Sequence, residues 1–343
     1  MKAAIFYEAN KPLKVEDVQA PRINPSDVLV KIKKCGICHT DIAIWSGTFP
    51  PRKGPPLILG HEISGEIVNV GENVKNFNVG DRIAVDSFIS CSKCFYCLTG
   101  NDNLCERGKR IGIDVDGGFA EFISIPEENA IKLPDEITFS EAALLEPMSI
   151  CYRAVKVANV QIEDVVALFG LGGLGLITLQ LLAKLRGAKV IAIDVIEEKL
   201  QTAKELGATE VINAAEKNPV EEIMKMTSNR GADCAIEVVG RPITQEQAVR
   251  CIRKGGKAVL VGAAMEPIKV NPQRFFREEI NITGAFGCQK SDLPKLIEII
   301  KEGKVDLKRL ISHEIDIEEI NFAFKVARGD IKEEKPMRVL ISA

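Results

Sequence analysis

The chain has 343 residues, 46% of them hydrophobic and 27% charged, so it is long enough for two globular domains and too apolar to be disordered. Its 45 Lys and Arg residues against 48 Asp and Glu residues give a net charge of -3 without a dense basic run, so we expect no nucleic-acid partner. No stretch reaches the roughly 18 apolar residues of a membrane span and no signal-peptide core is present, which predicts a cytoplasmic protein with no membrane partner.

The first part of the chain, to about residue 134, consists of short β-rich runs broken by Gly, Pro and Asn. Examples are VLVKIKKCG, SGEIVNVG, DRIAVDSF and FAEFISIP. This pattern predicts a compact, mostly antiparallel barrel or sandwich.

Two of the three histidines in the chain lie in this part, in the segments CHTD and GHE. Cys38 and His61 supply a thiolate and an imidazole from these separate segments, which is typical of an open catalytic zinc site with three protein ligands. The third ligand would be an oxygen atom, and the candidates are Glu62 and, in the apolar segment ALLEPMS, Glu146. Asp41 is a candidate to orient one of the ligands.

Four cysteines with the spacing C-x2-C-x2-C-x7-C follow at Cys91, Cys94, Cys97 and Cys105. This spacing puts four thiolates within reach of one tetrahedral metal ion, so we expect a structural zinc site without an open position for a substrate. Disulfides are the alternative, but three cysteines this close together would form strained small rings. The loop is therefore predicted to hold its own fold, and the chemistry lies elsewhere.

From about residue 164 the pattern changes to alternating strands and helices, which predicts a parallel doubly wound sheet. Gly170, Gly172 and Gly175 form G-x-G-x-x-G directly after the apolar strand VVALF. The first glycine permits the tight turn, the second lets the backbone approach a pyrophosphate, and the third lets the helix pack close to the strand. The expected cofactor site also includes Gly173 and Leu174.

The next strand, KVIAID, ends at Asp194, about twenty residues beyond the glycines. There a carboxylate can accept hydrogen bonds from the adenosine ribose and would repel a 2′-phosphate, so we expect NAD rather than NADP. Lys199 is a second candidate for a ribose contact. The alternatives are a helix cap for Asp194 and a solvated helix position for Lys199.

The end of the chain predicts two helical segments, DLPKLIEIIKEGK and one near residues 317–328, before a final strand, MRVLISA. We expect this strand to return to the first domain.

In this order, the motifs resemble those of the zinc-dependent medium-chain alcohol and polyol dehydrogenases over nearly the whole chain. The resemblance rests on CGICHTD, GHEISGEIVNVGENVKNFNVGDRI, the four-cysteine loop, LLEP, and GLGGLG with its downstream aspartate. It implies an α/β protein with a GroES-like, mostly-β catalytic domain, residues 1–148 and 287–343, and a Rossmann NAD-binding domain, residues 149–286. It also implies two zinc ions per subunit, one catalytic and one structural, and a homo-oligomer that is a tetramer or a dimer.

The resemblance implies that Cys38 and His61 bind catalytic zinc, while Glu62 and Glu146 alternate as ligands or as partners of a metal-bound water. Because it has a glutamate at position 146, the chain is similar to the sorbitol and threonine dehydrogenase branch of this family. The expected reaction is hydride transfer to NAD from the carbon that bears a secondary hydroxyl group of a polyol or sugar alcohol, which gives a ketone. Thr40 would take the hydroxyl proton first, and its alternative role is a buried hydroxyl at the start of a helix.

Other residues have open roles. His39 is a candidate for contact with the cofactor pyrophosphate or for passing the proton outward, and a surface histidine is the alternative. Ala43 stands where many relatives have a relay histidine, so the proton exit is open. The expected substrate pocket is less polar than a typical polyol site, and core packing is the alternative role of its residues, Ile44, Trp45, Phe49 and Phe286.

Three other functions compete with polyol oxidation. Within the same class, a short-chain secondary alcohol, a 2,3-diol or L-threonine is an alternative substrate. A non-catalytic relative that keeps the zinc sites is a second alternative. A nucleic-acid module built on the four-cysteine loop is disfavoured, because Asp102 and Glu106 offset the basic residues of that loop.

Overall fold

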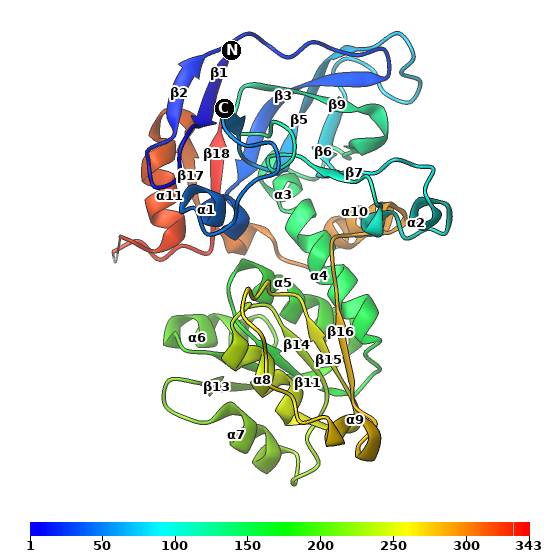
Figure 1. Cartoon of the computed structure of the whole chain (residues 1–343), viewed down its shortest axis with the longest axis vertical. Coiled ribbons are helices and arrows are strands. Elements are labelled where there is room, and N and C mark those ends of the chain that lie inside the picture. The colour runs from blue at the N-terminus through cyan, green and yellow to red at the C-terminus, as the bar shows by residue number, and fades with distance from the viewer. Residues whose placement is uncertain (332) are drawn as a thin grey trace. The chain divides into compact units, whose positions relative to one another are not determined.

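The computed structural model describes residues 1–331 and 333–343. The chain divides into two compact units (Figure 1). Unit 1 comprises Met1–Pro147, Gln289–Glu302 and Leu307–Ala343, and unit 2 comprises Met148–Cys288 with Gly303–Asp306. Unit 1 is therefore built from both ends of the chain and unit 2 from its middle. Among the described residues, no helix is long and apolar enough to cross a membrane.

The described strands of unit 1 form three sheets. One has the order β2-β1-β4, the largest has the order β10-β6-β5-β3-β18-β17 with β9 also on β3, and the third is the pair β7-β8. The strands are β1 (Lys2–Phe6), β2 (Lys14–Asp17), β3 (Asp27–Gly36), β4 (Leu57–Ile58), β5 (Glu62–Val70), β6 (Arg82–Val85), β7 (Phe88–Ile89), β8 (Lys109–Arg110), β9 (Phe122–Pro126), β10 (Ala130–Lys132), β17 (Ile311–Asp316) and β18 (Arg338–Ser342).

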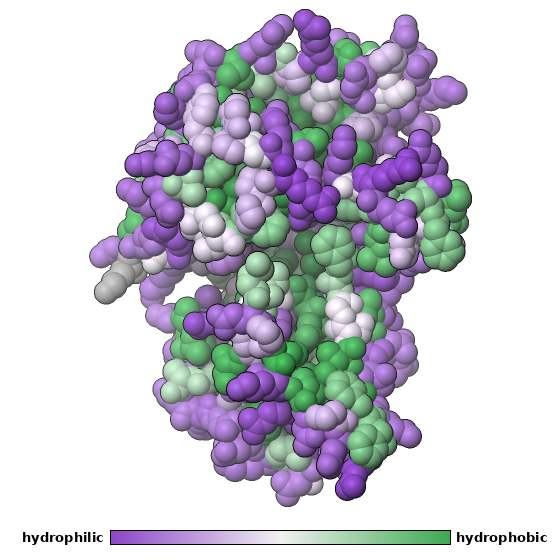
Figure 2. Space-filling model, in the orientation of Figure 1, coloured by the Kyte–Doolittle hydropathy of each residue, from purple (hydrophilic) through white to green (hydrophobic). Residues whose placement is uncertain are grey.

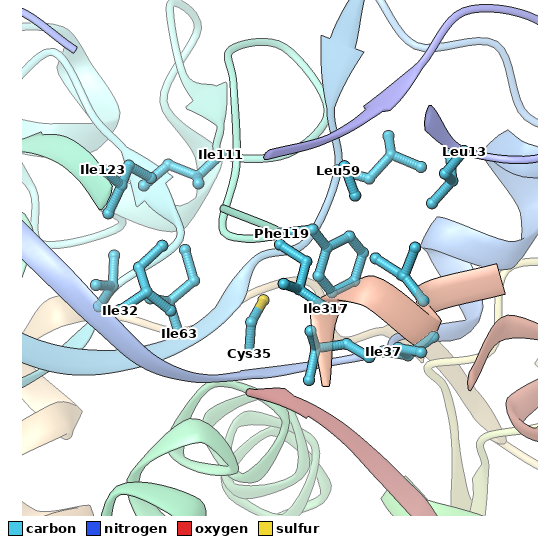
Figure 3. Close-up of a cluster of buried hydrophobic side chains, with 14 of the residues drawn as sticks. Leu13, Ile32, Cys35, Ile37, Leu59, Ile63, Ile111, Phe119, Ile123 and Ile317 are labelled. Atoms are coloured by element: carbon cyan, nitrogen blue, oxygen red, sulfur yellow. The ribbon is translucent and has the colours of Figure 1, made fainter. Parts of the chain in front are cut away.

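Strand β3 organises the largest sheet, because it pairs antiparallel with β5, β9 and β18. Alternate side chains of β3, at Val28, Val30 and Ile32, are buried, as expected for a strand with one face on a core. Figure 3 shows this core, in which Ile32 meets Ile63 from β5. The mostly antiparallel first domain and the return of the final strand to it are both confirmed.

Short helices connect these strands. They are α1 (His39–Trp45), α2 (Phe95–Leu98), η1 (Asp102–Leu104), η2 (Glu127–Asn129), α3 (Phe139–Ala143), α4 (Leu145–Ala158), which continues into unit 2, η4 (Lys290–Asp292), α10 (Leu293–Lys301), η5 (Lys308–Leu310), η6 (Ile317–Glu319) and α11 (Ile320–Arg328). The two helical segments expected near the end of the chain correspond to α10 and α11.

Unit 2 contains a six-stranded parallel sheet with the order β13-β12-β11-β14-β15-β16. The strands are β11 (Val165–Phe169), β12 (Lys189–Asp194), β13 (Glu210–Asn213), β14 (Ala232–Glu237), β15 (Ile252–Leu260) and β16 (Asn281–Gly284). The helices between them are α5 (Gly173–Gln180), η3 (Leu181–Leu185), α6 (Glu197–Glu205), α7 (Pro219–Met226), α8 (Pro242–Cys251) and α9 (Gln273–Arg277). This is the predicted doubly wound Rossmann arrangement, in which the strand order reverses between β11 and β14.

Candidate active site and metal centres

The start of α1 carries the first group of candidate residues. Cys38 is the residue that caps the helix, and the Asp41 carboxylate accepts a hydrogen bond from the Cys38 backbone N–H at 2.9 Å. The Thr40 hydroxyl lies 3.7 Å from Cys38 Sγ. The helix start therefore holds the thiol and the hydroxyl beside each other.

A second segment, at the start of β5, brings His61 and Glu62 to the same place. Its backbone turns at Gly60, where φ is +91° and a Cβ atom would come within 2.8 Å of Cys35 Sγ. Asp41 Oδ1 accepts the Gly60 backbone N–H at 3.1 Å and lies 3.5 Å from His61 Nδ1. One buried carboxylate thus ties the two segments together.

Side-chain atoms of Cys38, His61 and Glu62 lie within 4.8 Å of one another. His61 and Glu62 are buried, and His61 Nδ1 and Glu62 Oε1 have no hydrogen-bond partner among the residues that the structure describes. Burying such atoms is costly unless something satisfies them, and a thiolate, an imidazole and a carboxylate are the ligand types of catalytic zinc sites. The residues present therefore fit the metal that their sequence pattern predicts.

Arg338 from β18 forms an ion pair with Glu62, and both side chains are buried. Glu62 also lies directly over the backbone of its partner in the sheet, Gly36, where a Cβ atom would clash with Glu62 Oε2. The carboxylate is therefore fixed from two sides. Sequence reasoning missed Arg338; a charge inside the apolar strand MRVLISA was the available signal.

Glu146, in the first turn of α4, is not part of the group formed by Cys38, His61 and Glu62. The Ser87 hydroxyl donates a hydrogen bond to Glu146 Oε1 at 3.0 Å. Burial, opposed by His61, raises the pKa of Glu146 to about 7. Burial acts to lower the pKa of His61, but the charges of Asp41 and Cys38 outweigh it and raise that pKa well above its ordinary value. The negative groups around His61 and Glu146 therefore favour the binding of a proton or another positive charge at this site.

The four-cysteine loop brings Cys91, Cys94, Cys97 and Cys105 together. Cys94 Sγ lies 3.5 Å from Cys97 Sγ and 3.9 Å from Cys105 Sγ, and Cys91 Sγ lies 4.0 Å from Cys97 Sγ. A tetrahedral zinc ion with Zn–S bonds of about 2.3 Å requires sulfur atoms about 3.8 Å apart. The sulfur positions fit that geometry, and the cysteines are not joined by disulfides.

The same loop lacks a hydrophobic core of its own. Helix α2 buries none of its residues, and Phe95 and Leu98 are 70% and 75% exposed. Figure 2 shows this apolar surface at the α2 side of unit 1. Backbone N–H groups of Cys97 and Glu106 lower the pKa of Cys94 to about 6, whereas desolvation and hydrogen bonds with Cys94 and Cys105 raise the pKa of Cys97 to about 11. Ionising all four thiols therefore needs a cation among them. A metal ion would supply the cohesion that packing does not.

In unit 2 the glycine turn has the geometry that its sequence predicts. Gly170 has φ of +94°, and a Cβ atom at Gly175 would clash with the carbonyl oxygen of Gly170. A Cβ atom at Gly172 would meet nothing within 4 Å, so the backbone there lies open to an approaching group. Gly173 and Leu174 begin α5, whose N-terminus can bind a phosphate.

Asp194 ends β12 beside this turn. Its Oδ2 accepts the backbone N–H of Leu171 at 2.7 Å, and its Oδ1 accepts those of Val195 and Ile196 at 2.8 and 3.1 Å. Helix α6 begins at Glu197 and is capped by Ile196, so Asp194 is not its capping residue. Lys199 lies in the first turn of α6 and is half-buried.

Comparison with known proteins identifies the family. The alcohol dehydrogenase GroES-like domain matches residues 24–135, and the zinc-binding dehydrogenase domain matches residues 173–302. An alcohol dehydrogenase of Geobacillus stearothermophilus is 36% identical over 334 residues, which are 96% of this chain and 97% of that protein. The chain belongs to the zinc-dependent medium-chain dehydrogenase family.

Other members of this dehydrogenase family are similar over the same length. Sorbitol dehydrogenase of Bacillus subtilis strain 168 is 34% identical over 333 residues, which are 95% of this chain and 93% of that protein. A zinc-binding dehydrogenase of Sinorhizobium meliloti 1021, solved bound to NADP, is 31% identical with a TM-score of 0.92, and the match covers 100% of this chain and 99% of that chain. The chain is thus an oxidoreductase with the fold that its motifs predict.

Three of the residues expected to line the substrate pocket of this dehydrogenase lie in unit 1. Ile44 is buried in the core and 1% exposed. Phe49 packs against the same core, and the Arg110 guanidinium lies over its ring. The Trp45 indole donates to the Lys11 carbonyl oxygen at 2.7 Å. Phe286 belongs to unit 2 and is 53% exposed. Their lining role stays a prediction, as does the pyrophosphate contact of His39, which is exposed.

Proposed function

We propose that the chain is a zinc- and NAD-dependent dehydrogenase that oxidises a secondary hydroxyl group of a polyol or sugar alcohol to a ketone. The observation that carries this proposal is the convergence of Cys38, His61 and Glu62, whose ligand atoms lie within 4.8 Å of one another. The alcohol and sorbitol dehydrogenases among its relatives support the substrate class.

In this proposal residues 1–148 and 287–343 form the catalytic domain and residues 149–286 the NAD-binding domain. Zinc held by Cys38, His61 and Glu62 would supply a Lewis acid that polarises the substrate hydroxyl. The Thr40 hydroxyl, beside Cys38 Sγ, would accept the substrate proton while it passes its own proton on toward solvent, by a route that Ala43 leaves open. Glu146 would be the alternative oxygen ligand or the partner of a metal-bound water.

The preference for NAD rests on the end of β12. The Asp194 carboxylate is at the glycine turn, where it would repel a 2′-phosphate. The next residues, Val195 and Ile196, are apolar and exposed, at 60% and 42%, and offer a phosphate no positive charge. This makes NAD the expected cofactor, although one relative was solved with NADP.

A smaller secondary alcohol or 2,3-diol is the second candidate substrate. The apolar character of the expected pocket residues favours it, since a polyol needs polar partners for each of its hydroxyl groups. We further propose that the enzyme works in the cytoplasm. We also propose that it is a dimer or tetramer, and the mass of the purified protein in solution would test this number of subunits.

The experiment that tests the function is the rate of cofactor reduction with sorbitol, xylitol, 2,3-butanediol, 2-propanol and L-threonine, each with NAD and with NADP. We expect activity with NAD that a zinc chelator abolishes. Cys38→Ser should lose one of two bound zinc ions together with the activity. An active Cys38→Ser variant that contains a single zinc ion would contradict the proposed mechanism.

A further inference from the structure

A serine between β6 and β7 contacts a carboxylate of the candidate active site. Ser87 Oγ donates to Glu146 Oε1 over 3.0 Å, although the two residues are 59 positions apart. A carboxylate at the end of a Glu side chain can turn about several bonds, so one directed hydrogen bond restricts which way it faces.

Ser87 lies at the root of the four-cysteine loop, where the chain enters and leaves it. Its carbonyl oxygen accepts the backbone N–H of Ile111 at 2.9 Å. The next residue, Phe88, pairs with Arg110 in the β7-β8 ribbon. The Phe88 ring packs so closely over Gly108 that a Cβ atom there would clash with it. The closed loop therefore fixes the backbone that carries the hydroxyl.

The other side of Ser87 is held by Asn129, which is fully buried. Asn129 Nδ2 donates to the backbone carbonyl oxygens of Asp86 and Phe88 at 2.8 and 3.1 Å. The Asp86 backbone N–H donates in return to the backbone carbonyl oxygen of Asn129 at 2.8 Å. The backbone groups of both chain neighbours of Ser87 are thus held by hydrogen bonds, which restricts where the Ser87 hydroxyl can lie.

We propose that Ser87 is a positioning residue for Glu146, and that the four-cysteine loop acts through it on the catalytic metal site. This inference rests on the proposed function, because Glu146 matters only if metal binds beside Cys38 and His61. Ser87 itself contacts neither substrate nor cofactor in this proposal. It holds the carboxylate in one orientation, and the loop holds Ser87.

A double-mutant cycle on the full chain tests the proposal. Metal-depleted wild type, Ser87→Ala, Glu146→Ala and the double variant are titrated with Co²⁺, and the catalytic site is recognised by the absorption band that Cys38→Ser lacks. We expect Ser87→Ala to lower the affinity of that site for Co²⁺ about tenfold and to shift the absorption band. Loss of a residue that orients a metal ligand typically has an effect of this size. In the Glu146→Ala background, Ser87→Ala should have no further effect.

Matched variants separate this role from general stability. Ser124→Ala removes another partly buried hydroxyl that donates to a carboxylate, that of Asp27 at 3.4 Å, and should leave Co²⁺ binding unchanged. Ser87→Thr keeps the donor and should restore the wild-type band, whereas Ser87→Cys, a weak donor, should behave as Ser87→Ala does. In turnover, kcat should fall while KM for NAD stays constant.

The outcomes are distinguishable. If the effects of Ser87→Ala and Glu146→Ala multiply, Ser87 acts independently of the carboxylate and the inference is wrong while the proposed function stands. If the wild-type chain binds one metal ion instead of two, the proposed function fails first and the inference falls with it.

Discussion

Asp41 shows how much of this site depends on one residue without a ligand role. Its carboxylate accepts backbone N–H groups of Cys38 and Gly60 and lies 3.5 Å from His61 Nδ1. The residue is fully buried, and these contacts offset the cost of its burial. The two ligand-bearing segments are therefore held in register by a group that the sequence marks only by its place after Thr40.

Asp194 is a second single residue with a large expected effect, because in the proposed function it sets the preference for NAD over NADP. We expect Asp194→Asn to reduce the preference for NAD over NADP about tenfold, which corresponds to about 1.4 kcal/mol, because the negative charge that repels a 2′-phosphate is removed. The amide oxygen can still accept the Leu171 N–H, but the amide NH2 group cannot accept the N–H groups of Val195 and Ile196, so binding of both cofactors should also weaken to a similar extent. The ratio of kcat/KM for the two cofactors measures the change. An unchanged ratio, with an equal fall for both cofactors, would show that Asp194 supports the turn without selecting the cofactor.

At the scale of elements, the β11–α5 turn separates two kinds of glycine. Gly175 packs against Gly170 within the turn, whereas Gly172 faces open space. The first is required by the fold of the chain itself, and the second only by a group that approaches the backbone.

Gly172→Ala and Gly175→Ala should therefore differ. We expect Gly172→Ala to leave the melting temperature near that of wild type and to weaken NADH binding about tenfold or more, because the methyl group occupies the space of the pyrophosphate. Gly175→Ala should lower the melting temperature by several degrees, since its Cβ clashes with backbone. Thermal unfolding without cofactor and NADH titration measure the two effects. Unchanged NADH affinity in Gly172→Ala would place the pyrophosphate elsewhere.

Three strands of unit 2 are joined by Asp233 on β14. Its carboxylate accepts Arg230 Nη1 at 2.7 Å, Arg253 Nε from β15 at 2.6 Å and the Val165 N–H of β11 at 2.9 Å. Burial acts to raise the pKa of Asp233, but these hydrogen bonds outweigh it and lower the pKa to about 2.

This lowered pKa predicts a pH dependence of stability. A carboxylate whose pKa falls on folding stabilises the protein above its ordinary pKa, near 4, and the contribution is lost as the pH falls toward 2. We expect Asp233→Asn to lower the free energy of unfolding by about 2 kcal/mol at pH 7 and by less at pH 3. Urea unfolding of both proteins between pH 3 and 7 measures the difference. A difference that does not change with pH would mean that the ion pairs do not stabilise the charged carboxylate.

The sequence predicts those parts of the site whose constraints are local. The glycine turn and the four-cysteine loop each lie within about fifteen residues, so spacing alone reveals their geometry. Arg338 could not be assigned to Glu62, 276 residues away, nor Ser87 to Glu146, because tertiary pairing brings them together. The short apolar run around Trp45 leaves pocket lining and core packing equally open, since both need the same side chains.

At the scale of the whole molecule, the two ends of the chain meet in unit 1. Strand β18 pairs with β3 through Leu340 and Gly36, and it places Arg338 on Glu62. The buried ion pair therefore couples the last strand of the chain to a candidate metal ligand near its beginning.

Arg338→Met tests this coupling. Removing one partner leaves the Glu62 charge buried, so we expect the metal-free protein to lose about 3 kcal/mol of unfolding free energy, and Glu62→Gln/Arg338→Met to recover part of it. Zinc should reduce the loss in Arg338→Met, because the cation compensates the same carboxylate.

The ion pair between Lys2 and Glu318 also joins the two ends but is exposed, so Lys2→Ala should leave stability near wild type. Urea unfolding with and without zinc measures each case. Equal losses in the single and double variants would mean that Arg338 stabilises β18 through packing and not through the charge of Glu62.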